Sequence, residues 1–118
     1  MTNYLLLILF FSFVSKGLCV CDKNSIIVGT ERSGRLIGGK DEWNVEITNN
    51  CTCFQKSITL KCDGFQSVSP VDPRLFKKVA DHCLLNQGRA LPPFNSIKFS
   101  YAWYPPFFLI PQFSIVQC

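Results

Sequence analysis

The cysteines constrain the fold of this 118-residue chain more than any other feature, because seven of them must be accommodated in one small domain. An odd number is awkward in an oxidising compartment, where one thiol must stay free or pair between chains. Cleavage of an N-terminal leader after Cys19 would leave six, enough for three disulfides in any of fifteen connectivities. A bond between the two neighbours of the C-x-C pair is disfavoured, because so small a ring is strained. The six predicted disulfide cysteines are Cys21, Cys51, Cys53, Cys62, Cys83 and Cys118.

The N-terminus carries the signal for such a leader. The stretch YLLLILFFSFV, from Tyr4 to Val14, is interrupted only by Ser12. It has the length of a signal-peptide apolar region and is too short to span a bilayer. Small residues follow at cleavage-site spacing. We therefore predict a signal peptide over residues 1–19 and a single secreted, cysteine-rich β domain over residues 20–118.

Two alternatives concern the compartment and the cysteines. The second apolar stretch, Tyr101 to Val116, contains three prolines and cannot form an uninterrupted spanning helix, so we predict no membrane insertion after leader cleavage. A zinc site is the alternative use of four sulfurs. C-x-C is not the usual knuckle spacing, and a leader favours oxidised sulfur. The four cysteines in question are Cys51, Cys53, Cys62 and Cys83.

Alternating apolar and polar residues predict a mostly β fold. The period-two pattern appears in three segments, over residues 43–47, 57–62 and 97–103, with shorter strand signals at 25–28 and 113–118. Residues 30–40 are polar and glycine-rich and are interpreted as a mobile loop. Asp63-Gly64 predicts a hairpin turn with a return strand beginning at Phe65.

One short helix is predicted after these strands. Asp72 can cap it, Pro73 suits its first position, and an apolar stripe at helical spacing runs to Ala80. Together the elements predict a small, disulfide-stapled antiparallel β-sandwich with one short helix.

No catalytic or cofactor motif appears in the sequence. His82 is the only histidine, and its neighbour Cys83 is explained as half of a disulfide. Metalloprotease, nucleophile-elbow and phosphate-loop signatures are missing. We therefore predict no enzyme, no catalytic residue, no bound metal and no cofactor. The net charge of +4 is too small and too scattered for nucleic-acid binding.

Surface recognition remains as a function, and two groups of side chains are candidates for it. Tyr104 and Phe107 flank Pro105-Pro106, and exposed aromatic rings in a turn are typical anchors for a protein or a sugar ring. The basic group suits an acidic partner and comprises Arg74, Lys77, Lys78 and Arg89. Asn50-Cys51-Thr52 is a glycosylation sequon, with Asn50 as the acceptor.

From Trp43 to Cys118 the chain resembles the tapetum-determinant family of small secreted plant proteins. The matching motifs are WNVEITNNC, LKCDGFQSVSPVDP, DHCLLNQGRALPPFNSIKFSYAW and the terminal cysteine. The resemblance implies a secreted ligand perceived by a leucine-rich-repeat receptor kinase ectodomain in cell-fate specification or reproductive development. The short spacing of Cys51 and Cys53 and the turn after FSYAW differ from the founding member, so the chain is more similar to the uncharacterised relatives. The alternatives are an extracellular carbohydrate-binding module of the cell wall and a membrane-active defence peptide.

Overall fold

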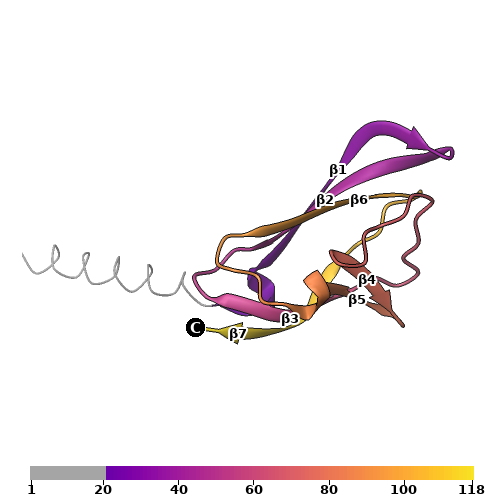
Figure 1. Cartoon of the computed structure of the whole chain (residues 1–118). Helices are drawn as coiled ribbons and strands as arrows, with labels where there is room; N and C mark the ends of the chain where they lie inside the picture. Colours follow the sequence, from indigo (N-terminus) through magenta and orange to yellow (C-terminus); the bar gives the residue numbers. More distant parts are fainter. Residues whose placement is uncertain (1–20) are drawn as a thin grey trace, which may run out of the picture.

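The computed structural model describes residues 21–118, which form two antiparallel β-sheets packed face to face (Figure 1). The predicted leader lies outside the described residues. The first sheet has the order β1-β2-β6 and the second the order β4-β5-β3-β7. The strands are β1 (Ile26–Ile37), β2 (Lys40–Asn49), β3 (Phe54–Lys61), β4 (Phe76–Val79), β5 (His82–Leu85), β6 (Ser96–Ala102) and β7 (Ile110–Gln117). The prediction of a mostly β, disulfide-stapled sandwich is confirmed.

The first sheet follows the period-two pattern of its strands. Val45 and Ile47 of β2 lie opposite Phe99 and Ile97 of β6, and the side chains on this face point toward the second sheet. The intervening Glu46 lies opposite Lys98 on the outer face, where the two side chains form an ion pair of 3.2 Å. Alternation therefore separates a buried from a solvated face, as the sequence predicts.

The interpretation of residues 30–40 as a mobile loop is wrong. These residues continue β1, turn at Gly38-Gly39 and return in β2, so that a hairpin projects beyond the sandwich (Figure 1). Both turn glycines have positive φ, of 55° and 81°, a conformation that is costly for other residues. Polar side chains suit this hairpin because much of it is exposed.

The predicted helix over residues 72–80 is also wrong. Asp72 does cap a turn, since its carboxylate accepts the N–H of Arg74 at 2.9 Å, but the chain then enters β4 and pairs with β5. Strand pairing buries Phe76 opposite Leu85 in the core, and this overrides the helical spacing of the apolar residues. The helical elements of residues 21–118 are two 3₁₀ turns, η1 (Lys23–Ser25) and η2 (Asn86–Gly88).

The hairpin predicted at Asp63-Gly64 is half correct. The turn forms, with the Phe65 N–H donating to Cys62 O at 3.0 Å, but no return strand follows it. The neighbours of β3 are instead β5 and β7, which arrive from later in the sequence. Phe65 leaves the turn to enter the core.

An aromatic cluster fills the core toward the hairpin end. The ring of Phe65 lies 5.3 Å from Phe76, 5.2 Å from Tyr101 and 5.2 Å from Phe107, measured between centroids, and Phe76 stacks on Phe99 at 4.5 Å. Tyr101 is fully buried. Each ring removes a large apolar area from water, so the cluster fixes the segments on both sides of it.

At the other end of the core the two sheets meet through polar side chains. Asn49 at the end of β2 and Gln55 in β3 are both fully buried, and the Gln55 amide donates to Asn49 Oδ1 at 3.0 Å. Ser114 of β7 donates its hydroxyl to Gln55 Oε1 at 2.6 Å. The pair therefore joins three strands from both sheets.

Two disulfides hold the second sheet. Cys53–Cys118 joins the start of β3 to the chain end after β7, and Cys62–Cys83 joins the end of β3 to β5. These pairings use three of the four cysteines of the zinc alternative in separate bridges, so that alternative is wrong. Cys21 and Cys51 are thiols in this structure. No helix within residues 21–118 is long and apolar enough to cross a membrane.

Candidate partner-binding surface

The proline-containing turn between β6 and β7 presents aromatic rings to solvent. Phe108 is 90% exposed and Tyr104 is 59% exposed. The base of the turn is held by two hydrogen bonds. The Trp103 N–H donates to Asp41 O at 3.1 Å, and the indole Nε1 of Trp43 donates to Trp103 O at 2.9 Å. Tyr104 and Phe108 are therefore displayed on a supported loop.

Phe107 points the other way. Its ring packs against Phe65 and Tyr101, and its backbone N–H donates to the Tyr101 hydroxyl at 2.9 Å. The structure thus gives the predicted contact residue Phe107 a partly buried position in the core, whereas its neighbour Phe108 is the exposed ring. Adjacent residues of the turn thus project to opposite sides, and the local sequence does not indicate which of the two rings enters the core.

Trp103 lies between the core and this exposed turn. It is partly buried, and the ammonium of Lys40 lies 4.9 Å from the centroid of its ring. The hairpin strand β2 repeats the arrangement, because the Arg32 guanidinium lies 5.3 Å from the ring of Trp43. Cations placed over indole faces add attraction that is strongest when water is excluded.

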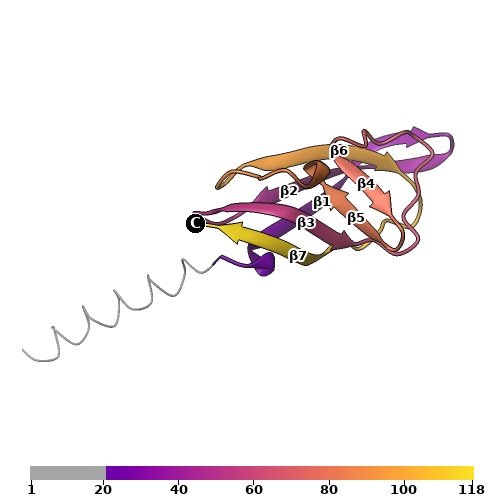
Figure 2. The same cartoon turned by 60° about the horizontal axis from the view of Figure 1, so that its bottom comes forward.

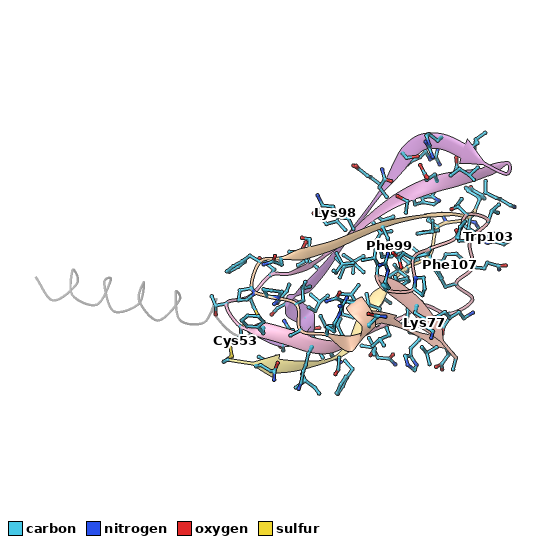
Figure 3. The ribbon with its side chains drawn as sticks, in the orientation of Figure 1. Cys53, Lys77, Lys98, Phe99, Trp103 and Phe107 are labelled. Carbon is cyan, nitrogen blue, oxygen red and sulfur yellow. A yellow bond between two sulfur atoms is a disulfide. The ribbon has the colours of Figure 1, made fainter. Side chains whose placement is uncertain are left out.

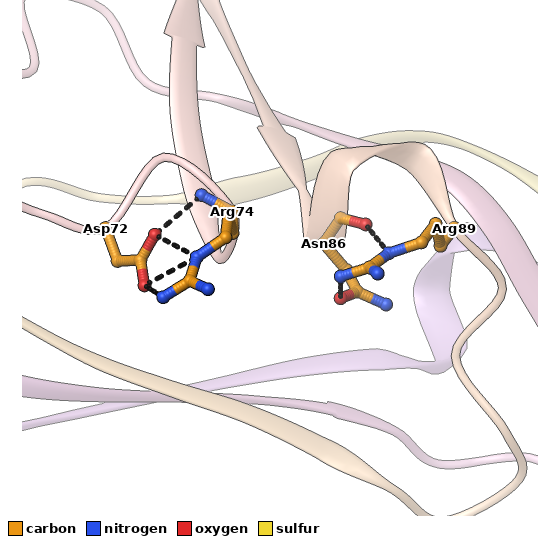
Figure 4. A network of polar contacts seen from close by, with 4 residues as sticks. All are labelled: Asp72, Arg74, Asn86 and Arg89. Carbon is orange, nitrogen blue, oxygen red and sulfur yellow. Dashed lines mark hydrogen bonds and ion pairs between the residues drawn. The ribbon is translucent and has the colours of Figure 1, made fainter.

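The four predicted basic residues are all exposed, but their charges are used differently. Arg74 is paired with Asp72 at 2.8 Å, while the Arg89 side chain donates to the backbone and side-chain oxygens of Asn86, at 3.3 Å each (Figure 4). The hydrogen bonds from Arg74 lower the pKa of Asp72 below its ordinary value. Arg74 is therefore neutralised locally, and Arg89 keeps its net charge.

The two lysines of β4 also differ. Lys78 Nζ donates to Phe65 O at 3.3 Å, which ties it to the loop below the aromatic cluster. Lys77 lies opposite Leu84 of β5 on the outer face of the second sheet. Of the predicted basic residues, Arg74 is thus the one with an acidic partner, whereas Lys77, Lys78 and Arg89 keep their net charge.

The aromatic turn and β4 lie at the same end of the sandwich. Figure 3 shows Trp103 and Lys77 at the end away from Cys53, and Figure 2 shows the end of β6 and β4 together there, opposite the C-terminus. Phe65 connects the two parts, since its carbonyl accepts from Lys78 and its ring packs on Phe107. We name this surface the distal end and define it by Tyr104, Phe108 and Lys77. Arg89 lies outside it, because Leu91, two residues later, pairs with Gln55 toward the opposite end of the core.

The sequence of residues 22–118 matches the family described as "Tapetum determinant 1, C-terminal". The chain belongs to the Tapetum determinant 1 family. It is 36% identical over 85 residues to TPD1 protein homolog 1 of Arabidopsis thaliana, which covers 70% of this chain and 48% of the relative. It is 32% identical over 114 residues to TPD1 protein homolog 1A of Oryza sativa subsp. japonica, covering 89% of this chain and 49% of the relative.

A third relative is an uncharacterized protein of Arabidopsis thaliana. It is 35% identical to this chain over 81 residues, and the match covers 65% of this chain and 63% of that protein. The chain thus spans about half the length of the first two curated relatives. No solved structure matches the chain. The family match covers both sheets, both disulfides and the whole distal end.

Two side chains that could take part in catalysis, those of His82 and Cys83, have partners within this Tapetum determinant 1 domain. His82 lies in β5, and its Nδ1 is 3.6 Å from Asp81 Oδ1. The neighbouring Cys83 is bonded to Cys62 and is no free thiol. No group of three or more histidine, cysteine or acidic side chains within residues 21–118 is placed to hold a metal ion.

The predicted glycosylation site lies at the opposite end from the distal end, in the turn between β2 and β3. Asn50 is exposed, while Cys51 in the middle of the sequon is buried. The acceptor side chain therefore points to solvent, and a glycan there would leave the distal end uncovered.

Proposed function

We propose that this chain is a secreted signalling ligand that binds the ectodomain of a leucine-rich-repeat receptor kinase, in plant cell-fate specification or reproductive development. Membership of the Tapetum determinant 1 family carries this proposal. The predicted leader over residues 1–19 supports export, and two disulfides suit an oxidising compartment. On this proposal the protein acts by binding and carries out no catalytic step.

The distal end is the surface that we propose for receptor contact. Tyr104 and Phe108 supply large rings that are already ordered by the turn, and rigid aromatic anchors commonly dominate the energy of protein interfaces. Lys77 lies at the same end of the sandwich and adds an exposed positive charge (Figure 3). Such a pattern fits an acidic, apolar patch on the concave face of a repeat domain.

The test is a direct binding assay. The protein is secreted with its own leader, purified, and measured by biolayer interferometry against a panel of immobilised receptor-kinase ectodomains. Saturable binding to one or a few members supports the proposal. Failure to bind any member of a panel that covers the receptor-kinase subfamilies would overturn it.

The contact surface is tested with a matched pair of variants. The double variant Tyr104→Ala, Phe108→Ala removes the two exposed rings and should weaken binding by about 30-fold or more, as expected for truncated anchors worth about 2 kcal/mol or more. Phe94→Ala is the control, because Phe94 is 61% exposed and lies before β6, away from the distal end. An equal loss in both variants would refute the assignment of the surface.

The alternative function is a carbohydrate-binding module of the cell wall. It is favoured by the same observation, exposed aromatic rings beside the partly buried Trp103, since such rings can stack on sugars. A glycan array separates the two functions. Binding to wall polysaccharides that is lost with Tyr104→Ala would favour the module, and an array without binding would remove it.

A further inference from the structure

The two cysteines outside the disulfides are brought together by the end of the β1–β2 hairpin. Ile26 at the start of β1 lies opposite Asn49 at the end of β2, and the Asn50 N–H donates to Ser25 O at 2.9 Å just beyond that pair. The chain then continues to Cys21 on one side and to Cys51 on the other. Strand register therefore brings the segments that carry Cys21 and Cys51 to the same end of the sheet.

The two thiols lie within hydrogen-bonding distance of each other. The Cys21 and Cys51 side chains share a hydrogen bond, and backbone groups of Thr52 and Cys53 also bond to the Cys21 thiol. Cys51 is 6% exposed, and two buried side chains hold its thiol in place. The Cys51 Sγ lies 3.2 Å from Asn49 Oδ1 and 3.5 Å from Gln55 Nε2. Two thiols held in contact by fixed neighbours are positioned for oxidation rather than for separate roles.

We propose that Cys21 and Cys51 form a third disulfide, which completes the connectivity Cys21–Cys51, Cys53–Cys118 and Cys62–Cys83. This inference is independent of the proposed receptor, because it rests on the geometry of the hairpin end. It selects one of the connectivities that the sequence leaves open.

The oxidation is a thiol–disulfide exchange with a disulfide oxidant, either oxidised glutathione or a thiol–disulfide oxidoreductase. The Cys21 thiolate attacks the oxidant and releases one thiol, and the Cys51 thiolate then attacks the Cys21 sulfur and releases the second. The two cysteines lose two protons and two electrons, and the oxidant is reduced to two thiols.

The surroundings fit this order of attack. Cys21 is partly exposed in an open groove of about 380 Å³ between η1 and β7, whereas Cys51 is buried. Burial acts to raise the pKa of Cys21, but the hydrogen bonds from Cys51 and from the following backbone outweigh it, so that the pKa is lowered. Burial and the bond to Cys21 raise the pKa of Cys51. The accessible thiol is thus the one that ionises first.

The third bridge gives the end of the molecule opposite the distal end a continuous covalent frame. Cys51 and Cys53 flank Thr52 in the β2–β3 turn, and their partners are the N-terminal Cys21 and the C-terminal Cys118. The turn would then hold both ends of the described chain at one place. This accounts for the close C-x-C spacing, since the two sulfurs have partners on opposite sides.

The test is a disulfide map of the protein secreted with its own leader. Intact mass after alkylation under denaturing conditions should show no alkyl group before reduction and six after it. Trypsin should then yield one cluster of three linked peptides, residues 20–23, 41–56 and 99–118, and a separate pair, residues 62–74 and 79–89. Two alkyl groups before reduction, on Cys21 and Cys51, would overturn the proposal.

Because Cys51 and Cys53 share a tryptic peptide, a variant resolves their partners. In Cys53→Ala, Cys118→Ala the link between residues 20–23 and 41–56 should persist, and its loss would overturn the pairing. Cys21→Ser is the complementary variant. It should expose one alkylatable thiol, on Cys51, while the other two bridges remain, and a free thiol on any other cysteine would overturn the pairing.

Discussion

Replacing Asn49 should destabilise this domain far more than replacing its neighbour Asn50, although the two are identical in type. Asn49 is fully buried, and its amide lies 2.8 Å from Cys53 O, 3.0 Å from Leu91 O and 3.2 Å from Pro92 O. Its two N–H hydrogens are thus shared among three carbonyls of two separate segments, and its oxygen accepts from Gln55.

The magnitude follows from these contacts. Asn49→Ala removes two donated hydrogen bonds and leaves the Gln55 amide without its acceptor. At about 1 kcal/mol for each of three buried bonds, the free energy of unfolding should fall by about 3 kcal/mol. With a urea dependence of about 1.5 kcal/mol per molar, the midpoint should drop by about 2 M. Asn50 is exposed, so Asn50→Ala should change stability by less than about 0.5 kcal/mol.

The assay is urea unfolding of disulfide-intact protein from the bacterial periplasm, where Asn50 carries no glycan, followed by tryptophan fluorescence. Asn49→Asp separates packing from hydrogen bonding, because it keeps the shape and replaces the donors by an acceptor that faces carbonyl oxygens. It should be at least as destabilising as Asn49→Ala at neutral pH. If Asn49→Asp unfolds within about 0.5 kcal/mol of the unmodified protein, the buried amide does not join the sheets.

Three further outcomes follow from the structure. The double variant Cys62→Ala, Cys83→Ala opens a loop whose ends are 21 residues apart. It should lower the free energy of unfolding, measured by heat or urea, by about 3 kcal/mol. A loss below about 1 kcal/mol would contradict a disulfide in the native protein. Burial raises the pKa of Tyr101 above its ordinary value near 10, so its contribution to stability is complete below pH 10 and is lost as pH rises through the folded-state pKa. Tyr101→Phe should lower the free energy of unfolding by about 1 kcal/mol at pH 7 and should flatten the alkaline unfolding curve measured by circular dichroism. An unchanged alkaline curve would count against this role. The hydrogen bonds from Arg74 lower the pKa of Asp72, so the ionised carboxylate contributes to stability above its ordinary pKa, and this contribution is lost as pH falls. Arg74→Gln should return the pKa of Asp72, measured by NMR, toward 3.8. An unchanged pKa would disprove the pairing in solution.

The strands of the sandwich could be predicted where one face of a strand is buried and the other is solvated. Val45, Ile47 and Phe99 alternate with polar residues, and that pattern fixes both the element and its faces. It failed for β4, where only Phe76 is buried and the three following residues are exposed. A four-residue edge strand carries too little periodicity to compete with a helical stripe, and its partner β5 is not evident from local sequence.

The hairpin of residues 30–40 was missed for a related reason. Its exposed half is mostly polar, and its apolar residues Leu36 and Ile37 are adjacent, so alternation gives no signal. Backbone pairing with β2 holds it instead. For the candidate surface, the sequence predicts exposed aromatic rings but not which rings are exposed. The sequence indicates that the turn after Trp103 is aromatic, whereas only the packing of Phe65 and Tyr101 shows that Phe107 enters the core and Phe108 does not.

The measurement that tests the central claim most directly is the affinity of the purified, secreted protein for receptor-kinase ectodomains. We expect saturable binding to a leucine-rich-repeat ectodomain, weakened about 30-fold by Tyr104→Ala, Phe108→Ala and unchanged by Phe94→Ala. Added salt should reduce the binding because Lys77 takes part. Absence of saturable binding across the panel, with a correctly folded and fully bridged protein, would contradict it.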